Sequence, residues 1–305
     1  MLANLSIRTK QLLAMVPLIG ALLFYGGVNI WEKYTTAMEM SHVEHLAELA
    51  VSGGLLVHEL QKERGASAGF IGSGGRKFGN TLQRQRQQTD RRIEEFRITL
   101  QRIERMGVLP GEAASYYRAA MQQLQSLPQI RRCVSGVPER PCQLGRVLRF
   151  YTGLIGKLMS GTLESMVHNH SMELVQAGTA YYMMLGVKEQ MGITRAVLAN
   201  AFAANHMSEQ GKVKLAGLMA RRGVYLDSFR LFATPDMKRG MEAILTSADG
   251  RQVEALIHKA LTTPVGQPLN EDSEQWFGLA TRFINQLKGL EDRIEQQLIS
   301  RARQV

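Results

Sequence analysis

The chain has 305 residues, of which 37 are Lys or Arg and 27 are Asp or Glu, so its formal net charge is +10. Hydrophobic residues make up 45% and charged residues 21%, a balance that favours a packed core over long disordered segments. Two cysteines are too few for a disulfide-rich scaffold or a four-cysteine zinc site. Composition therefore excludes disulfide-rich toxins, collagens and multi-pass transporters.

The N-terminal residues predict a membrane anchor. Residues 1–11 carry Arg8 and Lys10, and residues 12–31 are an uncharged, mostly apolar run of 20 residues. At about 1.5 Å per residue, a helix of that length spans roughly 30 Å, the thickness of a bilayer core. The positive flank predicts a cytoplasmic N-terminus. We expect a transmembrane helix at 12–31 and a periplasmic domain at 32–305 of a bacterial inner-membrane protein; the alternative is a cleaved signal peptide.

The rest of the chain predicts an all-α fold, because apolar residues recur at three- and four-residue steps and no alternating strand pattern stands out. The first helix, at 33–71, is broken by the glycine-rich stretch at 72–75. Further helices are expected at 80–105, 111–126, 143–170, 172–204, 207–232, 236–247, 251–262 and 273–302. The last one places an apolar stripe on one face, formed by Phe283, Leu287, Leu290, Ile294 and Leu298.

Cys133 and Cys142 bracket a short stretch that contains two prolines and a glycine. An exported domain permits a disulfide between them, which would close one loop. The alternative is two free thiols.

The chain also resembles itself. Residues 61–67 align with 192–198 at an offset of 131, and 82–97 align with 215–230 at an offset of 133. This pattern indicates a duplicated helical bundle, with halves near 45–130 and 172–300. Arg64 and Arg195 would then occupy equivalent positions.

The residues give little support to catalysis. No metalloprotease, hydrolase or P-loop motif is present, and the glycine-rich stretch lacks the spacing of a phosphate cradle. We expect no enzyme activity, no cofactor and no metal site. The basic surplus fits anionic partners, but an exported domain meets no nucleic acid, so anionic lipid headgroups or a small anion are the better partners.

Arg64 and Arg195 stand out because each lies in a helix that is otherwise apolar or built of small residues. A guanidinium that faces a bundle interior requires a counter-charge. Glu63 and Glu189 are candidates for buried ion pairs. Equally, the two arginines are suited to binding a planar anion, because each presents a flat fork of donors. The sequence leaves both readings open.

Four stretches together resemble the nitrate- and nitrite-sensing (NIT) domain. They are LVHELQKERGASAGFIGSGG, LQRQRQQTDRRIEEF, GVKEQMGITRAVLANAF and DSEQWFGLATRFINQLKGLED, and the resemblance covers roughly residues 45–300. It implies two stacked four-helix bundles that bind nitrate or nitrite between them through arginines. Arg64 and Arg195 match the basic positions of the motifs. Further candidate ligands are Ser67, Thr194, Arg239 and Arg251.

The resemblance also implies a signalling role. We expect the sensor region of a transmembrane receptor, most similar to a chemoreceptor, that passes a helix displacement across the membrane. Such a receptor is expected to be a homodimer, with a cytoplasmic signalling module on the same full-length chain. Two alternatives remain: a receptor for an organic anion or amino acid, and a membrane-anchored helical interaction protein without a small ligand.

Overall fold

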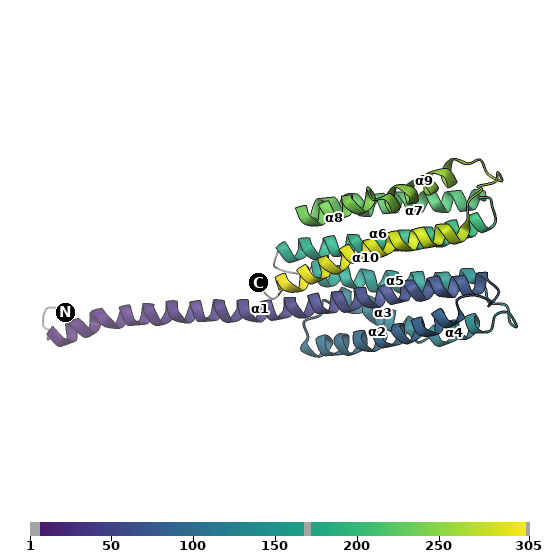
Figure 1. Cartoon of the computed structure of the whole chain (residues 1–305). Coiled ribbons are helices and arrows are strands. Elements are labelled where there is room, and N and C mark those ends of the chain that lie inside the picture. Colours follow the sequence, from purple (N-terminus) through teal and green to yellow (C-terminus); the bar gives the residue numbers. More distant parts are fainter. Residues whose placement is uncertain (1–6, 168–171, 303–305) are drawn as a thin grey trace. The chain divides into compact units, whose positions relative to one another are not determined.

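Helices account for the regular structure in the described part of the chain. The computed structural model describes the backbone of residues 7–167 and 172–302; the side chains of 7–14, 16–18, 32–41, 43 and 167 lie outside that description. In chain order (Figure 1), the elements are α1 (Ile7–Gly72), α2 (Gly79–Met106), α3 (Gly111–Leu124), α4 (Leu127–Ser135), α5 (Leu144–Val167), α6 (Met172–Ala203), α7 (Glu209–Phe232), α8 (Pro235–Leu245), α9 (Ala248–Thr262) and α10 (Ser273–Ala302).

The all-α prediction is confirmed, and most helix ends lie where local chemistry predicts them. α1 ends at Gly72, where the glycine-rich stretch begins. α8 starts with Thr234, whose hydroxyl accepts a hydrogen bond from the Met237 amide, and Pro235 follows at the first helical position. α4 was not predicted, because its nine residues contain a proline at the second position and end at the cysteine loop. Residues 168–170 of the helix predicted at 143–170 lie outside the described residues.

The predicted transmembrane helix at 12–31 receives no support from the structure. Within the part of the chain that is described, no helix contains a run both long and apolar enough to cross a membrane. Residues 1–6 and the side chains of 12–14 and 16–18 lie outside the described residues. In the remainder of the segment, Gly20, Gly26, Gly27 and Asn29 dilute the apolar side chains.

Two compact units divide the chain, Met1–Glu44 and His45–Val305. In the larger unit, α3 and α4 pack on α5, whereas α6 packs on α7 and α10. α8 and α9 pack on α10, and the two groups of helices meet where α5 packs on α6 (Figure 1). The apolar stripe predicted on α10 is buried from Phe283 to Leu298. Whether the two groups arose by duplication stays a prediction.

The core of the larger unit contains an ion pair that sequence patterning did not reveal. Lys188 of α6 pairs with Glu291 of α10, and both side chains are fully buried. Lys288 also donates a hydrogen bond to Glu291, at 2.9 Å. Burial lowers the pKa of Lys188, while the Glu291 carboxylate favours its charged form.

Because burial and nearby lysines lower the pKa of His58 on α1 to about 2, this histidine is neutral.

The two members of this pair should differ in their cost when removed. Glu291→Gln leaves Lys188 without its carboxylate and should lower the free energy of unfolding by about 3–5 kcal/mol. Lys188→Met should cost less, about 1–2 kcal/mol, because Lys288 still pairs with Glu291. Urea unfolding of both variants measures the difference. Equal losses would show that Lys288 does not compensate the charge of Glu291 once Lys188 is removed.

Candidate functional site

Glu63 and Arg64, two adjacent residues of α1, form hydrogen bonds with different partners. Successive side chains on a helix point about 100° apart, so Glu63 and Arg64 leave α1 in different directions. Glu63 is fully buried and accepts hydrogen bonds from Arg131 of α4, at 2.8 and 3.0 Å, and from the Tyr151 hydroxyl of α5, at 2.8 Å. Burial first, and then the Glu63 charge, raise the pKa of Tyr151, which keeps the phenol protonated as a donor.

Arg64 reaches toward α6 and forms a buried ion pair there. Its Nη1 and Nη2 donate to the two carboxylate oxygens of Glu189, at 2.5 and 3.0 Å. Nη1 also donates to Thr152 of α5, at 3.0 Å, and Gln61 donates to Glu189, at 2.8 Å. Of the two readings left open by the sequence, the structure assigns the buried ion pair to Arg64. Its positive charge is therefore compensated.

Arg195 of α6 differs, because no described carboxylate pairs with it. Its Nη1 donates to the Thr281 hydroxyl of α10, at 2.9 Å, and its guanidinium carbon lies 4.6 Å from the ring centre of Phe277. Its Nε is buried without a hydrogen-bond partner among the described residues. Burial first, and then the Arg64 charge, lower the pKa of Arg195 to about 10, so it remains a cation at neutral pH.

Two glycines allow the arginines to approach the opposite helix. A Cβ at Gly65 would lie 2.9 Å from Nη2 of Arg195, and one at Gly192 would lie 3.3 Å from Nη2 of Arg64. The guanidinium of Arg195 therefore lies against Gly65, which is next to Arg64. The guanidinium of Arg64 lies against Gly192, three residues before Arg195. This reciprocal packing places two positive charges and the one negative charge of Glu189 in the same region. The sum is one uncompensated positive charge, carried by Arg195.

A cavity of about 1450 Å³ adjoins this cluster. Its wall includes parts of α1, α5, α6, α7, α10 and the loop after α1, and contains apolar side chains such as Leu148, Val197 and Phe277. Glu274 is the acidic residue among its lining residues, and it pairs with Lys77. The basic residues that line the cavity are Arg64, Arg76, Lys77, Arg149, Arg195, Lys214 and Arg221. The cavity is therefore strongly positive.

The other residues named from the sequence lie elsewhere. Ser67 is buried on α1, and its hydroxyl has no hydrogen-bond partner among the described residues. Thr194 donates to the Gln190 carbonyl of its own helix, at 2.8 Å. Arg239 pairs with Asp236 on the surface of α8, and Arg251 donates to the Thr246 carbonyl at the start of α9. None of the four lines the cavity.

Sequence reasoning missed several residues that surround the arginines. Thr152 and Thr281 accept hydrogen bonds from Arg64 and Arg195, and Phe277 contacts the guanidinium of Arg195. The indole of Trp276 donates to the Arg195 carbonyl, at 2.9 Å, which ties α10 to the backbone at the site. Trp276, Phe277 and Thr281 lie in the last of the four recognised stretches. However, nothing in that stretch singles them out, because helix periodicity does not show which α10 residues face α6.

Comparison with known proteins places this geometry in context. The family model described as nitrate and nitrite sensing matches residues 55–299. A nitrate regulatory protein of Klebsiella oxytoca is 24% identical over 281 residues, which cover 89% of this chain and 68% of that protein. The structure of the NasR transcription antiterminator superposes with a TM-score of 0.80 at 22% identity, over 91% of this chain and 75% of that one.

The charge assignment predicts opposite effects for the two arginines on the anion-free protein. Arg64→Met leaves Glu189 buried without its partner and should lower the free energy of unfolding by about 3–5 kcal/mol. Arg195→Met removes a partly buried charge that has no acidic partner, so it should change that free energy by less than about 1 kcal/mol or increase it. Urea unfolding in a buffer without nitrate or nitrite measures both. A similar loss in both variants would contradict the assignment.

Proposed function

Because the chain belongs to the family of nitrate- and nitrite-sensing domains, we propose that it binds one nitrate or nitrite ion at Arg195, within the cavity between the helices. The observation that carries this proposal is the uncompensated charge. Arg64 is neutralised by Glu189, whereas Arg195 has no acidic partner in the described structure. A monovalent anion would bring the cluster of Arg64, Glu189 and Arg195 to neutrality.

The chemistry of the guanidinium suits such an ion. Arginine offers a planar fork of N–H donors, and nitrate and nitrite are flat anions with oxygen acceptors in one plane. Nη2 of Arg195 makes no hydrogen bond to a described residue, so it is available to an acceptor in the cavity. Hydrogen bonds to charged groups contribute about 1.5–3 kcal/mol each. Three or four of them, less the cost of association, give roughly −8 kcal/mol, which corresponds to micromolar affinity.

The contacts of Arg195 suggest how binding becomes a signal. The side chain belongs to α6, donates to α10 through Thr281 and lies against α1 at Gly65. An anion that binds the guanidinium of Arg195 therefore affects α1, α6 and α10 together. A signal requires that the ion bind two arrangements of these helices with different affinity. We propose that the ion favours the arrangement in which α1 and α6 lie closer, because it supplies the negative charge that Arg195 lacks where its guanidinium lies against α1.

The output and location of the sensor are separate from ligand binding. The relatives found are a nitrate regulatory protein and a transcription antiterminator, so we propose a regulatory role without chemistry of its own. The chemoreceptor output and the membrane anchor have no such support and are not part of the proposal. The disulfide between Cys133 and Cys142 is typical of oxidising compartments and supports an exported domain. A homodimer stays a prediction.

A second candidate ligand is favoured by the size of the cavity. Its volume of about 1450 Å³ far exceeds one nitrate ion, and even exceeds the usual range for pockets that hold small organic molecules. Apolar side chains such as Leu148 and Val197 line it together with the cations Arg149 and Lys214. An organic anion with an apolar body is therefore the alternative. Excess nitrate should displace it only if both use Arg195.

The direct test is isothermal titration of nitrate and nitrite into the 305-residue chain. We expect saturable binding in the micromolar range, and no comparable heat with chloride. Arg195→Met should abolish binding while the far-ultraviolet circular dichroism stays helical, because the variant removes the free cation and leaves the Arg64–Glu189 pair in place.

Matched controls are available on the same chain. Arg239→Met and Arg251→Met remove arginines that do not line the cavity, and both should bind nitrate like the unaltered chain. Unchanged binding in Arg195→Met would contradict the site. Absence of binding in the unaltered chain, together with saturable binding of an aromatic or aliphatic carboxylate, would favour the second candidate.

A further inference from the structure

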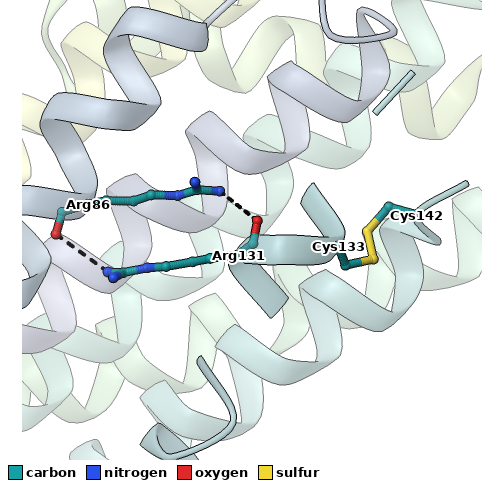
Figure 2. Close-up of a disulfide and its surroundings, with 4 residues drawn as sticks. All are labelled: Arg86, Arg131, Cys133 and Cys142. Carbon is teal, nitrogen blue, oxygen red and sulfur yellow. Dashed lines mark hydrogen bonds between the residues drawn. A yellow bond between two sulfur atoms is a disulfide. The ribbon is translucent and has the colours of Figure 1, made fainter. Parts of the chain in front are cut away.

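The disulfide lies at the junction between α4 and α5, and α5 lines the proposed anion site. The sulfurs of Cys133, in the last turn of α4, and Cys142, two residues before α5, are bonded (Figure 2). Both residues are half-buried, and residues 138–141 between them are exposed, so a soluble reductant can reach the bond. α5 continues from this junction into the cavity wall, with Leu148, Arg149 and Thr152.

α4 connects the disulfide to the Arg64 side of the site. Figure 2 shows that Arg86 and Arg131 each donate to the other's backbone carbonyl, at 3.2 and 3.4 Å. Arg86 also donates to Ser135, at 2.8 Å. Arg131 in turn holds Glu63, the residue next to Arg64 on α1. The position of α4 therefore bears on the turn of α1 that carries Arg64.

The closed loop connects the disulfide to the Arg195 side of the site. Gly75 has a φ of 78°, and a Cβ built there would lie 2.9 Å from the Val137 carbonyl oxygen, so the two loops are in close backbone contact. The segment after Gly75 includes Phe78, which lines the cavity. The Phe78 ring packs edge-on against Phe277, at 6.0 Å between centroids, and Phe277 contacts Arg195. Two chains of contact thus lead from one disulfide to both arginines.

We propose that the Cys133–Cys142 disulfide is a redox-sensitive control of the anion pocket. In the oxidised form it fixes the end of α4 and the loop at 136–142 against Gly75. A dithiol reductant converts it to two thiols: the S–S bond breaks, each sulfur gains one electron and one proton, and the reductant forms its own disulfide. The released loop no longer supports Phe78, and anion binding weakens.

The first test compares nitrate titrations of the oxidised chain with the chain reduced by dithiothreitol, and this arm rests on the proposed function. We expect the affinity to fall on the order of 5-fold on reduction, with unchanged helicity. The Cys133→Ser, Cys142→Ser double variant should match the reduced chain and show no further response to dithiothreitol. Equal affinity in the oxidised, reduced and double-variant proteins would overturn the proposal.

A pair of glycine variants tests the loop contact with the disulfide intact. Gly75→Ala places a methyl group against the Val137 carbonyl and should weaken nitrate binding as reduction does. Gly74→Ala is the matched control, because Gly74 also has a positive φ, of 61°, but has open space around it. Equal affinities for the two variants would contradict the route through Gly75.

A readout without ligand separates this inference from the proposed function. The amides of Gly75 and Lys77 are hydrogen-bonded, to the Phe70 carbonyl and the Ser73 hydroxyl, so their hydrogen exchange is measurable. Reduction should speed exchange at residues 75–78 in the anion-free chain. Unchanged exchange there would overturn the redox proposal even if nitrate binds. Faster exchange together with no nitrate binding would support it while the proposed function fails.

Discussion

The central feature of the site is the positive charge of Arg195, which no described carboxylate compensates. Arg64 and Glu189 form a buried pair between α1 and α6, and Arg195 lies beside them without an acidic partner among the described residues. Burial of a charge without compensation is costly, and glycines at 65 and 192 let both guanidinium groups come this close to the opposite helix. The fold can hold this arrangement because the rest of α6 and α10 is densely packed around it, including the fully buried Trp276 and Phe283. In the proposed function, a bound anion supplies the missing charge.

The turn of α1 around residue 63 links the site to the surrounding helices. Glu63 is hydrogen-bonded to α4 and α5, whereas Arg64 is hydrogen-bonded to α6 and α5, so a shift of any of these helices acts on the same turn of α1. The same turn lies on the route by which we propose that the disulfide acts on the arginines, since α4 carries both Arg131 and Cys133. Ion pairs such as that between Arg64 and Glu189 suit the transmission of a helix shift. A carboxylate and a guanidinium joined by two hydrogen bonds have a defined geometry, whereas apolar side chains in contact slide past one another more easily.

The fold could be predicted from the sequence further than the site could. Helix periodicity and capping residues located the helices, apart from α4. The equivalence of Arg64 and Arg195 that the internal similarity suggests stays a prediction. Periodicity could not show that Glu189 pairs with Arg64 and not with Arg195, because this depends on how α1 and α6 cross. Nor could it show that Arg239 and Arg251 do not line the cavity, or that Lys188 pairs with Glu291 in the core. The apolar run at 12–31 predicted a membrane span from composition, which the described structure does not support.

The most direct test of the uncompensated charge is a crystal structure of the chain grown with saturating nitrate. The account predicts flat, three-pointed density against Nη2 of Arg195 inside the cavity, with the hydrogen bonds between Arg64 and Glu189 intact. Density that separates Arg64 from Glu189, or nitrate bound at a site away from Arg195, would contradict it. So would an empty cavity at a nitrate concentration that saturates binding in solution.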